Sequence, residues 1–240
     1  MKKILKSSSK IRAQNEKSSL IASALFSNTG VTLGGFICYL LFGDEGLYFS
    51  SLYISSFLPF YYLVAFPMMN HYSSISGYSI RQSSFKLFTD PTSGIPITFI
   101  ITGIILNSMG IKRPQILNYL VTHIFIYIST SGYSFSIGLG TSLGKSIRYW
   151  GHTLFIAFIK FVYNPIIALF LLYIFGYFGL KNTIPSRVIL VESFMPTAIM
   201  SVVLVKIFNL NEDLANAAWL ITNMMTIVVF PILILLKRTI

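Results

Sequence analysis

Charged side chains are scarce in this sequence. Only 10% of the 240 residues are Asp, Glu, Lys or Arg, whereas 54% are hydrophobic. A soluble protein needs more charge than this to cover its surface, so the composition predicts an integral membrane protein embedded in the lipid bilayer. The net charge of +11 comes from basic residues that lie between apolar runs. Contact with anionic lipid explains this distribution, and we expect no nucleic-acid partner.

Cysteine and the residue patterns of common enzymes are also missing. The single cysteine, Cys38, excludes an intrachain disulfide, and its apolar neighbours predict a small buried packing residue. The sequence contains no H-E-x-x-H pair, no G-x-S-x-G turn and no cluster of Cys and His. We therefore expect a protein that is not an enzyme and that binds neither a metal nor a cofactor.

Long apolar runs make up most of the chain. Clusters of polar and turn residues divide them into segments close to the roughly 20 residues that cross a hydrocarbon core of about 30 Å. We expect all of these segments to be helical, because backbone groups cannot remain unpaired in lipid. The seven predicted spans are Ser19–Phe42, Leu47–Met69, Thr92–Met109, Gln115–Leu143, Thr153–Leu180, Val188–Phe208 and Leu214–Leu236.

The positions of the basic residues predict the orientation. With the N-terminus in the cytoplasm, eleven of the 18 Lys and Arg residues flank the cytoplasmic ends of the spans and six flank the outer ends. Positive residues favour the cytoplasmic side. We therefore expect a basic cytoplasmic tail over residues 1–17, a cytoplasmic loop over residues 70–90 and, with seven spans, a C-terminus outside.

Two of the predicted spans contain residues that interrupt a helix. In VILVESFMPTAIMSVVLV, Pro196 has no N–H to donate to the carbonyl of Glu192, so the helix must kink or break. The span Ser19–Phe42 contains SNTG at 27–30 and GG at 34–35, which also weaken a helix. Each interrupted span ends in an acidic turn, FGDEGL or FNLNEDL, and the two run in opposite directions. This pattern is typical of an inverted repeat whose broken helices build a substrate site near the bilayer midplane.

Four stretches, taken in their order along the chain, point to a particular protein family: SNTGVTLGG, DPTSGIPITFIITGIILNSMGIKRP, IKFVYNPIIALF and VESFMPTAIMSVVLVKIFNLNEDLANAAWLITNMMTIVVFPILILL. Together they resemble the auxin efflux carrier family of membrane transporters, within the bile acid/sodium symporter-like superfamily, over about residues 18–236. Members of that family have ten helices in two inverted five-helix repeats, with crossovers in the fourth and ninth, and export organic anions. The resemblance implies that Asn28–Gly30 is the first crossover and Pro196 the second.

The sequence departs from that family at its beginning. The resemblance implies that the first three helices are absent, that residues 18–69 are a two-helix remnant of the first repeat, and that residues 91–240 form a complete second repeat. We therefore expect an all-α membrane protein with an incomplete five-plus-five inverted repeat, and a truncated or mis-started gene product explains it. The partners that we consider are a homo-oligomer and a full-length paralogue, and a full-length paralogue could supply the missing helices.

The two interruptions define the predicted substrate site. We expect the organic anion to be held by Asn28, Thr29, Gly30, Pro196 and Thr197. The N-terminal end of a half-helix carries about half a positive charge, which attracts a carboxylate without a buried cation.

Three further polar residues are candidates for the site, and two of them, Lys160 and Glu192, have more than one interpretation. Lys160 and Asn164 lie four residues apart on one helical face, so they could contact the substrate, and Lys160 could also pair with Glu192. Alternatively, Lys160 extends to the cytoplasmic interface. Glu192 is either the residue that couples transport to protons or a side chain that reaches the outer interface beside a structural kink.

Together these features predict a secondary-active transporter in the cell membrane that exports small organic anions, driven by a proton or ion gradient or by the membrane potential. Two alternatives remain open. The chain could be a remnant without transport activity that regulates a full-length carrier, or a seven-helix ligand sensor. A retinal sensor is excluded, because Leu214–Leu236 has no lysine that could form a Schiff base.

Overall fold

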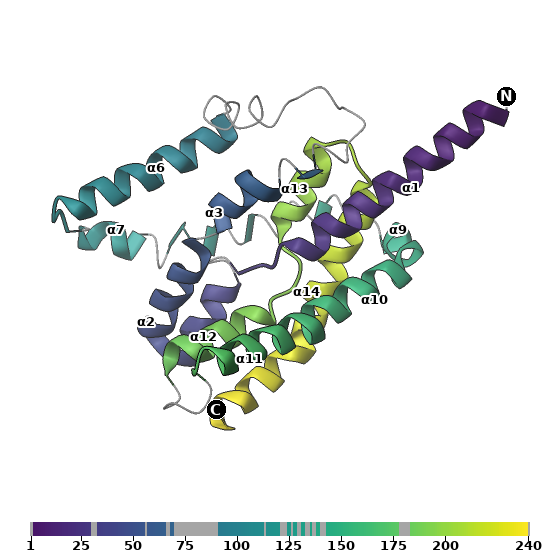
Figure 1. Ribbon diagram of the computed structural model, residues 1–240. Coiled ribbons are helices and arrows are strands. Elements are labelled where there is room, and N and C mark those ends of the chain that lie inside the picture. The colour runs from purple at the N-terminus through teal and green to yellow at the C-terminus, as the bar shows by residue number, and fades with distance from the viewer. Residues whose placement is uncertain are drawn as a thin grey trace.

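Helices are the regular elements in every part of the chain that the computed structural model describes (Figure 1). The described residues are 2–29, 33–55, 57–65, 68–69, 91–112, 114–120, 124–125, 127–128, 131–132, 135, 138–139, 143–177 and 183–239. The predicted all-α class is therefore confirmed for these residues. The predicted loop 70–90 lies outside them.

The described helices fall, in chain order, into two halves of the chain. The first half contains α1 (Lys2–Leu25), α2 (Gly34–Ser55), α3 (Phe57–Phe60), the π-helix η1 (Tyr61–Ala65), α6 (Pro91–Ser108) and α7 (Gln115–Leu120). The second half contains α9 (Leu143–Arg148), α10 (Trp150–Phe158), the π-helix η3 (Ile159–Tyr163), α11 (Asn164–Ile174), α12 (Ile184–Ser193), α13 (Ile199–Ile207) and α14 (Glu212–Thr239).

Both predicted helix interruptions are present. The helix α1 ends at Leu25 and α2 begins at Gly34, and the described residues between them are not helical apart from a turn at Leu33. In the second case α12 ends at Ser193 and α13 begins at Ile199. Both helices therefore stop at the residues that disfavour them: one at SNTG, which has a weak helix preference, and the other near Pro196, which lacks an N–H.

The first helix starts earlier than predicted. It begins at Lys2, so the basic residues before Ser19 belong to the same helix as Ser19. Lys, Arg, Gln and Glu are good helix formers, which explains why low hydropathy does not end the helix.

The predicted turn FGDEGL is a sharp bend inside α2. Gly43 has φ 68° and ψ −152°, a backbone conformation open only to glycine. A Cβ at Gly46 would lie 2.8 Å from the Cβ of Phe42 and would overlap the carbonyl of Cys38. The two arms of α2 therefore approach each other so closely that this position also requires glycine.

Two helices among the described residues are long and apolar enough to cross a bilayer, Trp150–Ile174 and Glu212–Leu235. They correspond to the predicted spans Thr153–Leu180 and Leu214–Leu236. Core helices of soluble proteins can also be this long and apolar, so the seven-span topology stays a prediction. The second interrupted span is not among these long helices, because its halves α12 and α13 contain only 10 and 9 residues.

The interrupted helices pack crosswise (Figure 1). The helix α1 lies against α13 and α14, while α2 lies against α12, so each half of one interrupted helix contacts the opposite half of the other. One apolar cluster, which includes Phe26 and Leu204, packs on the α1–α13 side of the crossing. A second cluster, which includes Ile37 and Val191, packs on the α2–α12 side. The two breaks therefore lie between two buried cores.

Candidate functional site

The two breaks meet and pair through their backbones. Ser27 and Thr197 form an antiparallel bridge. The N–H of Asn28 donates to the carbonyl of Pro196 at 2.7 Å, and the N–H of Ala198 donates to the carbonyl of Phe26 at 3.0 Å. These bonds satisfy backbone groups that the breaks release, as a buried segment requires. The predicted meeting of the breaks is confirmed for Asn28 and Pro196, whereas Gly30 lies outside the described residues.

The second break is also held by α14. The N–H of Thr197 donates to the hydroxyl of Thr222 at 3.1 Å, and the side-chain amide of Asn223 donates to the carbonyl of Thr197 at 3.2 Å. The hydroxyl of Thr197 donates to the carbonyl of Ser23 at 3.2 Å. Sequence reasoning missed Thr222 and Asn223, although a polar pair inside the apolar run WLITNMMT is a usable signal.

The side chain of Lys160, which belongs to η3, is fully buried against the carboxyl end of α1. Its ammonium donates to the carbonyl of Ala24 at 2.7 Å and to the hydroxyl of Ser27 at 3.0 Å. The interpretation that Lys160 extends to the cytoplasmic interface is therefore wrong, and its described partners include no carboxylate. The π-helix η3 contains Lys160, and its wide turn is closed by the N–H of Asn164, which donates to the carbonyl of Ile159.

Glu192 is fully buried in the last turn of α12, directly before the second break. Its Oε1 accepts hydrogen bonds from the hydroxyl of Ser50 and from the thiol of Cys38, the latter at 3.8 Å. Its Oε2 has no hydrogen-bond partner among the described residues and lies against Gly34. The interpretation that Glu192 reaches the outer interface is therefore wrong. Cys38 is buried as predicted, but it also contacts this carboxyl group.

Gly34 is the position that makes room for the carboxyl group. A Cβ there would lie 2.8 Å from Cδ and 2.9 Å from Oε1 of Glu192, and closer still to Oε2. The glycine pair at 34–35 therefore does more than loosen a helix, because its first member allows the two interrupted helices to approach.

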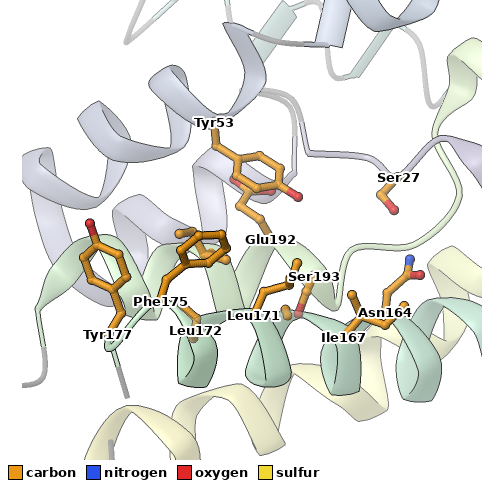
Figure 2. A pocket seen from close by; sticks show the side chains of 12 residues that line it. Ser27, Tyr53, Asn164, Ile167, Leu171, Leu172, Phe175, Tyr177, Glu192 and Ser193 are labelled. Atoms are coloured by element: carbon orange, nitrogen blue, oxygen red, sulfur yellow. The ribbon is translucent and has the colours of Figure 1, made fainter. Parts of the chain in front are cut away.

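A cavity of about 440 Å³ lies beside the crossing, between α11, α12 and the second arm of α2 (Figure 2). Its polar lining consists of Ser27, Asn164, Glu192 and Ser193, to which the aromatic residue Tyr53 adds a hydroxyl. The remaining lining is apolar or aromatic and comes from Ile167, Ala168, Leu171, Leu172, Phe175, Tyr177 and Ile189. In Figure 2 the side chains of Tyr53 and Glu192 lie near the middle of the view, with Tyr177 and Phe175 to one side of them and Asn164 to the other. The cavity thus combines an apolar wall with a few polar groups.

The predicted site residues divide into two groups. Asn164 and Glu192 line the cavity. Asn28, Pro196, Thr197 and Lys160 instead build the crossing behind it, and the hydroxyl of Thr29, which is almost fully buried, donates to the carbonyl of Ser27 at 3.4 Å. Sequence reasoning missed Ser193 and Tyr53, because neither residue type is unusual in an apolar helix.

No protein-family model, curated protein or solved structure matches the chain. The resemblance to the auxin efflux carriers therefore rests on the quoted residues of this sequence and on their order.

Proposed function

We propose that this protein is a secondary-active transporter of the auxin efflux carrier type that exports small organic anions across the cell membrane. The observation that carries the proposal is the bridge between Ser27 and Thr197, which joins two broken helices at their breaks. Paired broken helices of opposite direction are the usual frame of substrate sites in secondary transporters.

The surface of the two long apolar helices supports a membrane location. Only 28% of the apolar window in Trp150–Ile174 and 29% of that in Glu212–Leu235 is buried. Phe170 is 60% exposed and Ile227 is 75% exposed, and many apolar neighbours on these helices are exposed as well. Contact of such apolar surface with water costs about 25 cal/mol per Å², and lipid removes this cost.

The crossing supplies the chemistry for an organic anion. The half-helices α2 and α13 both begin beside the bridge, and the partial positive charge of a helix N-terminus attracts a carboxylate. The apolar wall of the cavity suits a carbon skeleton, while Ser27, Asn164 and Ser193 offer hydrogen bonds.

Glu192 is the residue that we assign to proton coupling. It lines the cavity, its described partners include no cation, and its Oε2 accepts no hydrogen bond from the described residues. A charged carboxylate in this place would also repel a bound anion. Glu192 is therefore neutral while the substrate is bound and ionises when the cavity opens to water, which links export to a proton gradient.

Flux measurements on Pro196→Ala test the proposal. Restoring the missing N–H allows α12 and α13 to join, so this variant should insert into membranes normally and lose most carboxylate flux in proteoliposomes. Pro185→Ala is the matched control, because Pro185 lies in the first turn of α12, where a helix tolerates proline. The control should keep its flux.

Two results would change the conclusion. Normal flux through Pro196→Ala would show that the break is only a packing kink. If the wild-type chain transports no carboxylate by itself but alters the flux of a co-reconstituted full-length homologue, it is a regulatory partner instead of a carrier.

A further inference from the structure

Hydrogen-bond donors from two distant parts of the chain bind the carbonyl groups at the carboxyl end of α1. The last carbonyls of a helix have no partner within the helix. Here the carbonyl of Ser23 accepts from the hydroxyl of Thr197, and the carbonyl of Phe26 accepts from the N–H of Ala198. The carbonyl of Ala24 accepts from the ammonium of Lys160, which also binds the hydroxyl of Ser27. A side chain from a distant helix thus places a cation at the break.

Carbonyl and hydroxyl oxygens at such a place form a cation site. In transporters with broken helices, unwound carbonyls and the carboxyl ends of half-helices coordinate the coupling cation, because the helix dipole is negative there. Lys160 is fully buried and its described partners are oxygens without formal charge. Burial of an ammonium without a carboxylate costs several kcal/mol unless the site itself favours a cation.

We propose that Lys160 is a built-in cation: its ammonium fills the cation site at the carboxyl end of α1, so the crossing requires no free Na⁺ or K⁺. If the protein is a transporter, as we propose, the filled site has a consequence for ion coupling: transport cannot be coupled to a metal ion bound at this position. The occupation of the site by a cation is a property of the fold and is tested without transport.

The test compares the unfolding temperature of the purified protein in detergent with NaCl, KCl and choline chloride at equal ionic strength. The wild-type protein should unfold at the same temperature in all three salts. Lys160→Ala removes the last three side-chain carbons and the ammonium, so it should unfold at a lower temperature. Propylammonium chloride, which has the missing atoms, or NaCl should then restore most of the loss, whereas propanol should not.

One further variant separates the effect of the charge of Lys160 from the effect of its packing, and another serves as a control. Lys160→Met fills the same space without an ammonium, so it should also be destabilised and no cation should restore it. Lys206→Ala in α13 is the matched control, because Lys206 is exposed, and it should respond like the wild-type protein.

Three results would overturn the proposal: specific stabilisation of the wild-type protein by Na⁺ or K⁺, a Lys160→Met variant as stable as the wild-type protein, or a Lys160→Ala variant that no cation restores. The comparison of salts on the wild-type protein decides the matter even if a variant cannot be purified. Absence of flux would contradict the transport proposal and leave these unfolding temperatures unaffected.

Discussion

Gly34→Ala is the most informative single substitution at the crossing. Gly34 begins α2, and the carboxyl group of Glu192 lies against it. An added methyl group would lie 2.8 Å from Cδ of Glu192, which is shorter than van der Waals contact allows. The carboxyl group would have to move, and its hydrogen bond from Ser50 would be lost.

The expected size of the effect follows from two opposing contributions. Loss of a hydrogen bond to a buried polar group costs about 1–3 kcal/mol. Replacement of glycine by alanine within a helix stabilises by roughly 0.5–1 kcal/mol. The free energy of unfolding should therefore fall by up to about 2.5 kcal/mol in total, or up to about 10 °C in unfolding temperature for a chain of this length.

A double-mutant cycle tests the cause. In a Glu192→Ala background no carboxyl group opposes the methyl group, so Gly34→Ala should become stabilising by roughly 0.5–1 kcal/mol. Gly103→Ala in α6 is the control, because a Cβ there meets nothing within 4 Å, and its effect should be the same in both backgrounds. An equal loss of stability from Gly34→Ala in both backgrounds would refute the contact with Glu192 as its cause.

Two further predictions concern topology and pH. Reporter fusions at the two ends of the chain should lie on opposite sides of the membrane, with the N-terminus in the cytoplasm; two cytoplasmic ends would mean an even number of spans and would exclude the repeat assignment. If the anion binds with Glu192 protonated, as we propose, substrate binding to the wild-type protein should weaken as the pH rises, whereas Glu192→Gln should bind at the level seen at low pH throughout. A wild-type pH dependence that persists in Glu192→Gln would assign the coupling proton to another group.

The sequence alone determined the features that depend on local covalent structure. The lack of an N–H at Pro196 and the weak helix preference of SNTG predict a break wherever these residues occur, and both breaks are present. The acidic turn predicted at FGDEGL is present as the bend inside α2, where Gly43 adopts a positive φ. The composition also predicted helices, because an apolar chain in lipid must pair its backbone groups internally.

Only the tertiary structure decided where the buried charged groups lie. Lys160 and Glu192 each had two interpretations, because a position along a helix does not show whether a long side chain reaches an interface or a neighbouring helix. The partners that settle them are distant in sequence: Lys160 binds Ala24, and Glu192 binds Ser50 and contacts Gly34. No local pattern encodes these contacts, since the hydrogen bonds of Lys160 with Ala24 and of Glu192 with Ser50 join residues 136 and 142 positions apart in the chain. The break positions are therefore local properties of the chain, whereas the contacts of Lys160 and Glu192 depend on how the helices pack.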